Sequence, residues 1–278
     1  MKLLTLSKFY RKFPDFKGKQ RLGRMLFKKQ IETEIDLVVK GKYDINYLLP
    51  NIKENIGYEI FINGIYEKET VDFICSKLTF GSIYIDIGAN IGSIVIPVSK
   101  KMGNIHGLCI EASPTVYGYL EKNMLANQIE NIKIINIAIS DTDNKLVSFY
   151  SPSGQFGKGH MSGIIKEESI NVETIKLDSL LQNYQIANPD FIKIDIEGFE
   201  YFAFKGAQSV LFQEKAPDIL FEFEDWAESR AGLKPGSAQS FLLNSGYKLY
   251  KLEKNQLSLI NSPLEKGSFM IYASKYSQ

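Results

Sequence analysis

The stretch that most constrains the fold of this chain covers residues 83–92 and reads I-Y-I-D-I-G-A-N-I-G. Its apolar residues are typical of a short strand that is buried on both faces of a parallel sheet. Gly88 and Gly92 follow the strand, and glycine lets a backbone turn tightly and approach a ligand closely. A second apolar run ends in Glu111, nineteen residues after Gly92. This spacing predicts a nucleotide-binding α/β fold in which the acid holds a ribose at the tip of the second strand.

The turn departs from the dinucleotide fingerprint G-x-G-x-x-G. Asn90 occupies the position of the second glycine, and no third glycine follows at the required spacing. A pyrophosphate needs that close backbone approach, whereas a nucleoside without phosphates does not. We therefore expect S-adenosyl-L-methionine (SAM) as the ligand. An NAD(P)-dependent oxidoreductase on the same fold is the alternative, and a glycine-rich turn that binds no ligand would show the same local pattern.

The composition is typical of one large domain, or of one domain with an extension. The chain has 278 residues, of which 44% are hydrophobic and 23% are charged, as in ordinary soluble enzymes. No apolar run approaches the roughly 20 residues that cross a bilayer, and early basic residues argue against a secretory signal. Cys75 and Cys109 lack metal-type spacing, so we expect buried thiols in a reducing, cytoplasmic compartment. With only two histidines, a His-rich metal site is not expected.

Positive charge is concentrated at the N-terminus. The first 30 residues hold ten Lys or Arg and one acid, a net charge of +9, which leaves −8 on the remainder of a chain with net charge +1. We expect residues 1–50 to form a basic extension and residues 51–278 to form the main domain. Such an arm would contact an anionic membrane or another polyanion, or it would dock on the domain as a solvated helix. Apolar residues recur at helical spacing within it, at Leu3, Leu6, Tyr10 and Phe13.

The rest of the chain predicts alternating strands and helices, and therefore a mostly parallel sheet with helices on both faces. Residues 31–66 should form short strands and turns. The insert 141–188 should hold two strands, at 146–150 and 172–175, and a glycine-rich loop, 154–163, that acts as a lid or as a mobile surface loop. The last two strands should pair antiparallel, because no helix separates them. We expect strands at 83–87, 105–110, 132–138, 191–196, 219–224, 247–252 and 269–273, and helices at 69–78, 115–127, 201–213 and 237–244.

Charged residues alternate with isoleucine at the end of the fourth of these strands, where residues 191–200 read F-I-K-I-D-I-E-G-F-E. Lys193, Asp195 and Glu197 would share one face of a strand, which is not an ordinary core pattern. At the carboxyl edge of the sheet they would line the crevice where doubly wound folds bind ligands. A buried salt-bridge network is the alternative. Glu200 is expected at the start of the next helix, where it favours the helix dipole.

Acidic residues also end the fifth strand, where residues 221–226 read F-E-F-E-D-W. Glu222 and Glu224 would share a face beside the only tryptophan, Trp226. This pattern indicates either a second part of the ligand crevice or a strand that exposes one side at its end.

The ordered set of motifs resembles the FkbM family of SAM-dependent methyltransferases. The resemblance covers residues 64–224 and leaves residues 1–50 outside. It implies a Rossmann-like class I methyltransferase fold with a seven-stranded, mostly parallel sheet of order 3-2-1-4-5-7-6, an antiparallel last strand and helices on both faces. It also implies O-methylation of a hydroxyl, most often on a sugar, a glycan or a secondary metabolite. The motifs are G-I-Y-E, Y-I-D-I-G-A-N-I-G, I-E-A-S-P-T, I-N-I-A-I-S-D, L-D-S-L-L, F-I-K-I-D-I-E-G-F-E and P-D-I-L-F-E-F-E.

The same resemblance implies which residues bind the cofactor. Glu111 would accept hydrogen bonds from both ribose hydroxyls, with Ser113 nearby, and Ala138 would lie beside the adenine. Asp195 would lie beside the sulfonium, and Glu67 would close over the cofactor. The amino-acid end of SAM would be held by Asp86, Gly88, Asn90 and Gly92.

Methyl transfer to an alcohol requires positioning, which alone can lower a barrier by roughly 7–11 kcal/mol, and a base that removes the hydroxyl proton. We expect His160 or Asp195 to be that base, because histidine titrates nearest to neutrality. Glu197 and Lys193 would then orient the acceptor. A Mg²⁺ ion held by Asp195 and Glu224 is the rival arrangement, but no clear three-ligand cluster is present, so we expect no metal.

Two further classes of function are a non-catalytic recruitment module and a nucleic-acid methyltransferase. A non-catalytic module recruited through its basic arm would bind lipid or polyanion in a salt-dependent way. A nucleic-acid methyltransferase is disfavoured, because the Asn-Pro-Pro-aromatic motif is absent after the fourth strand and the main domain is acidic. We therefore expect a small-molecule or glycan acceptor.

Overall fold

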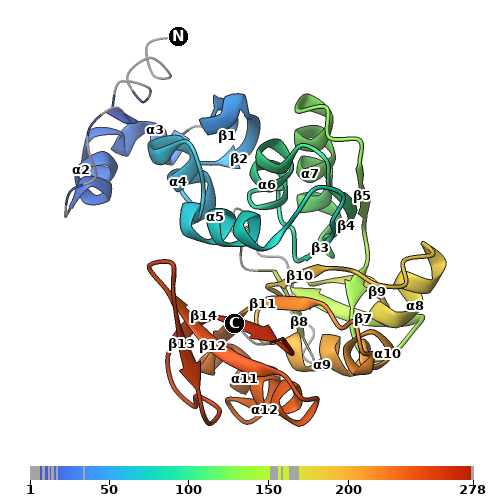
Figure 1. Ribbon diagram of the computed structural model, residues 1–278. Helices are drawn as coiled ribbons and strands as arrows, with labels where there is room; N and C mark the ends of the chain where they lie inside the picture. Colours follow the sequence, from blue (N-terminus) through green and yellow to red (C-terminus); the bar gives the residue numbers. More distant parts are fainter. Residues whose placement is uncertain are drawn as a thin grey trace.

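The computed structural model describes residues 7, 10, 11, 13, 16, 18–33, 35–150, 156–157, 159–162 and 169–276 (Figure 1). Within this part of the chain, an eight-stranded sheet lies at the centre of the molecule, in the order β13-β12-β14-β11-β10-β3-β4-β5. The strands are β3 (Ile83–Ile87), β4 (His106–Ile110), β5 (Ile132–Ile135), β10 (Phe191–Ile194), β11 (Asp218–Glu224), β12 (Lys248–Glu253), β13 (Gln256–Ile260) and β14 (Ser268–Ser274).

The expected strand order is confirmed, with one strand added. The strands β5, β4, β3, β10 and β11 pair in parallel, and β14 lies antiparallel between β11 and β12. The expected count of seven strands is wrong, because β13 extends the sheet by pairing antiparallel with β12. Lys254 and Asn255 form the tight turn between them, both with positive φ (49° and 60°), as two-residue hairpin turns require.

The two faces of the sheet carry separate apolar cores, because successive residues of a strand point to opposite sides. Tyr84 and Phe191 belong to the core on one face, and Ile85 and Ile192 belong to the core on the other. The first face is covered by α4 (Asn55–Asn63), α5 (Lys68–Lys77), α6 (Val95–Met102) and α7 (Pro114–Ala126). The second is covered by α8 (Leu177–Asn183), α9 (Glu200–Lys205), α10 (Gln208–Phe212) and α12 (Ser237–Asn244), with α11 (Asp225–Arg230) following β11.

Two helix expectations need correction. Residues 55–63 form the helix α4 and not a strand. Six of its nine residues are buried, and a segment that is apolar on most sides shows no clear helical or strand period in its sequence. The expected helix 201–213 is divided into α9 and α10 at Gly206, whose α-carbon packs so closely on the carbonyl oxygen of Ser140 that a Cβ would lie 2.0 Å from it. The start of α7 is confirmed, since Ser113 caps it and Pro114 is its first residue.

The insert after β5 forms a second sheet of four strands within the described residues, in the order β6-β9-β7-β8. Its strands are β6 (Ala138–Ile139), β7 (Lys145–Tyr150), β8 (His160–Ser162) and β9 (Ser169–Ile175). The single strand expected at 132–138 is therefore wrong, because β5 ends at Ile135 and Ala138 already belongs to the second sheet. Within the glycine-rich loop proposed as a lid, residues 154, 155, 158 and 163 lie outside the described residues, as do residues 164–168, and residues 160–162 form β8.

The N-terminal residues precede a small hairpin on the first face of the central sheet. They form α2 (Lys19–Leu26) and α3 (Lys28–Thr33), followed by β1 (Ile35–Lys40), a 3₁₀ turn η1 (Lys42–Asp44) and β2 (Asn46–Asn51), which pairs antiparallel with β1. In Figure 1 these elements, coloured blue, lie beside α4 at one end of the molecule.

The described part of the basic arm is docked on the domain. Tyr10 is buried and donates a hydrogen bond to the carbonyl of Lys19 at 2.6 Å. The Arg11 guanidinium donates to the carbonyl oxygens of Ile60 and Phe61 at 3.0 and 2.8 Å. Leu3 and Leu6, which helical spacing placed with Tyr10 and Phe13 in the basic arm, lie outside the described residues. Among the helices that the structure describes, none has the length and apolar character needed to span a bilayer.

Candidate active site

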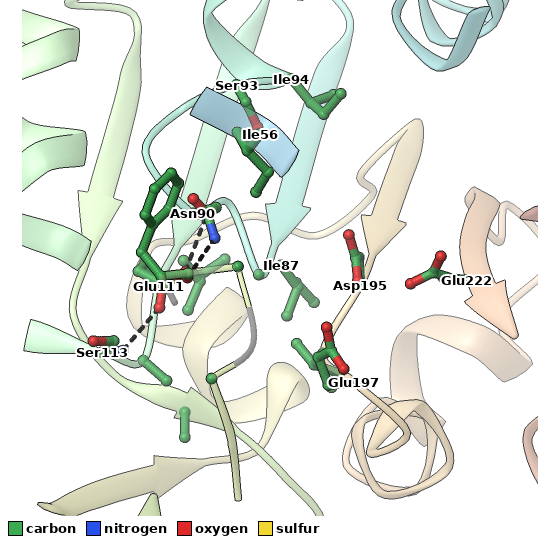
Figure 2. Close-up of a pocket in the computed structure, with 18 of the residues that line it drawn as sticks. Ile56, Ile87, Asn90, Ser93, Ile94, Glu111, Ser113, Asp195, Glu197 and Glu222 are labelled. Carbon is green, nitrogen blue, oxygen red and sulfur yellow. Dashed lines mark hydrogen bonds between the residues drawn. The ribbon is translucent and has the colours of Figure 1, made fainter. Parts of the chain in front are cut away.

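A cavity of about 310 Å³ opens at the carboxyl ends of β3, β4, β10 and β11. This is the edge at which open α/β sheets bind their ligands. Figure 2 shows two groups of polar side chains on opposite sides of Ile87. Glu111, Asn90 and Ser113 form the first group, which we call the ribose wall. Asp195, Glu197 and Glu222 belong to the second, which together with Glu224 we call the acid wall.

The turn after β3 gives the ribose wall its shape. Gly88 has a φ of +75°, and a Cβ built on it would lie 1.8 Å from the carbonyl oxygen of Asp195. Only glycine fits this crossing of two backbones. Asn90 also has a positive φ, +54°, which asparagine tolerates better than most residues. Its side-chain amide donates to the carbonyl of Phe156 at 2.9 Å, which ties the turn to the insert.

Glu111 is the central residue of the ribose wall. Its Oε2 accepts the backbone N–H of Asn90 at 2.9 Å, and its Oε1 accepts that of Ser113 at 2.8 Å (Figure 2). The side chain is buried, and burial raises its pKa to about 7 against the opposing effect of these two donors. Each carboxylate oxygen keeps acceptor capacity beyond one hydrogen bond. Two neighbouring hydroxyls of a ribose therefore match the remaining acceptor positions of these two oxygens.

Lys193 and Asp86 form a buried ion pair behind the ribose wall. They are opposite each other in the pairing of β3 with β10, and Nζ of Lys193 lies 3.4 Å from Oδ1 of Asp86. The same ammonium group lies 3.5 Å from Oδ2 of Asp195 and donates to the carbonyl of Gly88 at 3.1 Å. Burial lowers the pKa of Lys193, but the carboxylates of Asp86, Asp195 and Glu67 outweigh this effect and raise it above its ordinary value. Lys193 therefore stays charged and fixes the position of Asp195.

The acid wall is not the strand face that the sequence predicted. β10 ends at Ile194, so Asp195 and Glu197 lie in the turn before α9, and Glu197 has a left-handed backbone with a φ of +57°. Glu200 holds this turn in place, because its Oε1 accepts the N–H groups of Ile196 and Gly198 at 2.9 and 3.4 Å. Gly198 is required there, since a Cβ would lie 2.3 Å from the backbone of Ala227 and its φ is +97°.

Several carboxyl groups lie close together and partly buried on the acid wall, and both conditions raise their pKa values. Burial, together with the charges of Asp195 and Glu224, raises the pKa of Glu197 to about 7. Burial and the same neighbours raise the pKa of Glu222 to about 10. Arg230 opposes the shift of Glu197, since its Nη2 donates to the carbonyl of Glu197 at 2.6 Å and lies 3.6 Å from Oε2. The wall therefore holds an acid and a base at neutral pH.

Eight of the predicted site residues line the cavity: Gly88, Asn90, Glu111, Ser113, Ala138, Lys193, Asp195 and Glu197. The structure does not bring Asp86 to it, because that carboxylate is fully buried against Lys193. Gly92 packs on Ile96 and Leu120. Glu67 stands outside the lining, next to Tyr66, and burial together with the charge of Asp195 raises its pKa.

His160 is also absent from the cavity lining. It lies in β8, only 5% exposed, with Nδ1 2.8 Å from the carbonyl oxygen of Met161 and its ring centroid 5.2 Å from that of Tyr150. Its two neighbours, Gly159 and Met161, do line the cavity. Because side chains alternate along a strand, His160 points away from the site.

Several lining residues were missed by the sequence analysis. Glu222 and Trp226 were noted as a pattern but given no role, and Glu224 was considered only as a ligand of the rival Mg²⁺ ion, although their position at a strand end was the available signal. Glu54 and Ile56 approach from the start of α4, in a segment read as strands, so no signal for them existed. Among the described residues, no group of three or more His, Cys, Asp or Glu side chains is placed to hold a metal ion.

Comparisons with known proteins identify the family. The model of the FkbM methyltransferase domain matches residues 86–249. No curated protein matches the chain. Solved structures that resemble it include the precorrin-6y C5,15-methyltransferase of Geobacter metallireducens GS-15, with 17% identity, a TM-score of 0.43 and coverage of 76% of this chain and 92% of that one. SMU.1697c of Streptococcus mutans, in complex with SAH, gives 10% identity, a TM-score of 0.43 and coverage of 74% and 95%.

The METTL16 MTase domain gives 14% identity, a TM-score of 0.46 and coverage of 93% of this chain and 79% of that one. The family match is the decisive finding, since it spans more than half of the chain and contains the turn after β3, Glu111 and the whole acid wall. The protein is therefore a member of the FkbM methyltransferase family, and its cofactor is S-adenosyl-L-methionine.

Proposed function

We propose that the protein methylates a hydroxyl group of a polyhydroxylated acceptor, such as a sugar or a glycan. The observation that supports this most directly is the acid wall. It places the carboxyl groups of Asp195, Glu197 and Glu222 in the same cavity as Glu111, and the pKa values of Glu197 and Glu222 are raised to about 7 and about 10. Carboxyl groups are the side chains that accept protons from hydroxyls and hydrogen-bond to them.

The residues of the ribose wall fit the cofactor. Glu111 would accept hydrogen bonds from the two ribose hydroxyls, and Gly88 and Asn90 line the part of the cavity where the amino-acid end of the molecule would lie. Ala138 and Ile139 give the cavity an apolar side suited to an adenine ring. When bound, SAM supplies an electrophilic methyl group on a sulfonium. The charged Lys193 keeps the Asp195 carboxylate in place at the boundary between the two walls.

Glu197 replaces His160 as the proposed base. Its pKa of about 7 leaves a substantial fraction ionised at neutral pH while keeping its proton affinity high, which is the compromise that general-base catalysis favours. Glu222, with a pKa of about 10, retains its proton and would donate a hydrogen bond to a neighbouring oxygen of the acceptor. The two side chains would thus hold adjacent hydroxyls and deprotonate one of them.

The exposed ring of Trp226 favours an acceptor that has a flat apolar face. It lines the cavity and is 51% exposed. The Arg230 guanidinium lies 4.7 Å from the centre of its ring and also bonds Glu197, so Trp226 and the proposed base are held by one side chain. A pyranose, which has an apolar C–H face and hydroxyls around its rim, would contact both the ring and the carboxyl groups.

The proposal is tested by transfer of a labelled methyl group. The protein is incubated with trideuteromethyl-SAM and a panel of oligosaccharides, matched amino sugars and small amines, and the products are located by mass spectrometry. We expect label on oxygen in saccharides, and loss of transfer in Asp195→Asn but not in Glu121→Gln, an exposed glutamate of α7. Label found only on nitrogen, or full activity of Asp195→Asn, would contradict the proposal.

A thermal-shift experiment separates this function from dinucleotide-dependent oxidation. A ligand that binds only the folded state raises the melting temperature. S-adenosylhomocysteine should stabilise the protein, and NAD and NADP should leave it unchanged at the same concentration. The reverse result would show that the cavity serves a dinucleotide.

A further inference from the structure

The outward face of α2 is unusual for a surface helix because it carries large apolar side chains. Leu22, Met25 and Leu26 are 36%, 68% and 55% exposed. Phe13 and Phe16, which precede the helix, are each 46% exposed. Scattered exposed apolar residues need no explanation, but a contiguous group of them on one element indicates an interaction surface.

The apolar residues are bordered by basic ones. With about 3.6 residues per turn, Arg21 and Arg24 lie on one flank of α2, while Leu22, Met25 and Leu26 occupy the adjoining sector, and Lys28 follows at the start of α3. Arg21, Lys28 and Lys29 are exposed. The first 30 residues together carry a net charge of +9. We call the outward face of α2 with Lys28 and Lys29 the basic apolar face.

This helix is fixed to the domain by its opposite side. Gly23 and Phe27 are buried, and a Cβ on Gly23 would lie 2.6 Å from the hydroxyl of Tyr58. Tyr58, in α4, donates a hydrogen bond to the carbonyl of Gln20 at 2.6 Å. The Arg24 guanidinium lies 4.1 Å from the centre of the Tyr58 ring. The basic apolar face is therefore presented on a rigid support.

We propose that the basic apolar face binds the surface of a membrane that contains anionic lipids. An interfacial helix lies in the plane of the membrane, with aliphatic side chains inserted at the headgroup boundary and Lys and Arg beside the lipid phosphates. Charge alone would suit a nucleic acid equally well. The exposed aliphatic side chains of Leu22, Met25 and Leu26 favour the membrane over a nucleic acid. A nucleic-acid surface is polar, so aliphatic side chains would not be removed from a polar environment by binding to it.

The position of the face relates it to the cavity. α4 contacts α2 through Tyr58, while Glu54 and Ile56 at its start line the cavity. One short helix thus connects the two surfaces.

The test is co-sedimentation of the full-length protein with vesicles of phosphatidylcholine alone, or with vesicles that also contain about 30 mol per cent of the anionic lipid phosphatidylglycerol. We expect binding only to the anionic vesicles, weakening as salt rises from about 0.05 to 0.5 M. Arg21→Gln combined with Lys28→Gln should weaken partitioning about tenfold or more. Met25→Ser combined with Leu26→Ser should weaken it about tenfold as well.

Matched substitutions elsewhere on the surface are the controls. Leu125 is 79% exposed and Lys145 is exposed, so Leu125→Ser with Lys145→Gln changes one apolar and one basic residue outside the face and should leave partitioning unchanged. Unchanged affinity for S-adenosylhomocysteine in every variant shows that the fold is intact. Equal binding to neutral vesicles, equal loss in the control, or binding to RNA without binding to anionic vesicles would overturn the proposal.

Discussion

The ribose wall and the acid wall are built from the same residue type in opposite ways. On the ribose wall, each oxygen of Glu111 accepts one backbone N–H, from Asn90 and from Ser113. On the acid wall, carboxyl groups face one another, and Arg230 is the cation placed beside Glu197. Each wall contains a glutamate whose pKa is raised to about 7, mainly by burial. Glu111 is held by backbone donors, whereas Glu197 also faces the negative charges of Asp195 and Glu224.

The difference indicates how one cavity divides binding from chemistry. A carboxylate fixed by backbone donors has a defined orientation and suits a ligand whose hydroxyls are always presented in the same way. Carboxyl groups that repel one another keep protons at neutral pH and can exchange them with an acceptor. Substitutions on either wall test this division.

The largest effect is expected on the acid wall, from Glu197→Gln. Removing a general base should lower kcat by about 100- to 10,000-fold, with little change in cofactor affinity. In the unmodified protein, kcat should rise with pH to a plateau above pH 7, because Glu197 must be ionised, and fall again near pH 10 as Glu222 loses its proton. The rising limb should vanish in Glu197→Gln. Steady-state kinetics across pH checks this, and an unchanged profile would remove the distinction between the walls.

Glu111→Gln should act on binding and leave the acid wall unaffected. An amide has one acceptor oxygen where the carboxylate has two, so the affinity for S-adenosylhomocysteine should fall about 10- to 100-fold. Ribose hydroxyls donate to the ionised form, so affinity in the unmodified protein should rise with pH up to about 7 and stay constant above it.

Calorimetry measures both effects of this prediction. Below pH 7, binding should release a proton from Glu111, and this release should be absent in Glu111→Gln. The exposed Glu121→Gln is the matched control and should keep the affinity and the proton release. A pH-independent affinity in the unmodified protein would mean that Glu111 does not hold the ribose.

Glu200 holds the turn that carries Asp195 and Glu197 of the acid wall. Two substitutions distinguish the contribution of its hydrogen bonds from that of its charge. Glu200→Ala leaves the N–H groups of Ile196 and Gly198 without their acceptor, so the free energy of unfolding should fall by about 1–3 kcal/mol. Glu200→Gln keeps an acceptor oxygen and should be stable.

The pH dependence of unfolding sharpens this test. Burial raises the pKa of Glu200 to about 8 from an ordinary value of 4.5. Between these two values the unfolded chain has lost the proton and the folded protein has kept it, so this group lowers stability as pH rises from 4.5 to 8. Urea unfolding should show that Glu200→Gln removes this loss. Equal stability of the Ala and Gln variants would show that the turn does not depend on Glu200.

The smallest effect is expected from Trp226→Ala. Loss of an aromatic contact at a half-open site is worth about 0.5–1.5 kcal/mol, so KM for the acceptor should rise about two- to tenfold while kcat stays near its original value. Trp226→Phe should restore most of the affinity, because it keeps an apolar ring. A fall in kcat without a change in KM would instead place Trp226 in the positioning of Glu197 through Arg230.

The sequence was most informative where a local pattern has one physical reading. The buried strand before Gly88 and the acid after β4 follow from an apolar run and from spacing, whereas the roles of Asn90 and Ser113 in cofactor binding came from the family resemblance and stay predictions. The acid wall was predicted for the wrong reason. Alternation suggested a strand through Glu197, whereas the chain turns after Ile194, and the carboxyl groups still meet because Glu200 and Gly198 shape the turn.

The sequence alone indicated the strand at Ile83–Ile87 and the acid that follows the second strand, because an apolar run and a spacing are local features. Its resemblance to the FkbM family supplied the order of the central sheet and the cofactor. Only the tertiary structure decided that Asp86 pairs with Lys193 away from the cavity, that His160 faces Tyr150, and that Arg230 joins Glu197 to Trp226. These arrangements join residues from separate elements through side-chain direction and burial, and a linear pattern of residue types does not encode the direction in which a side chain meets a distant partner.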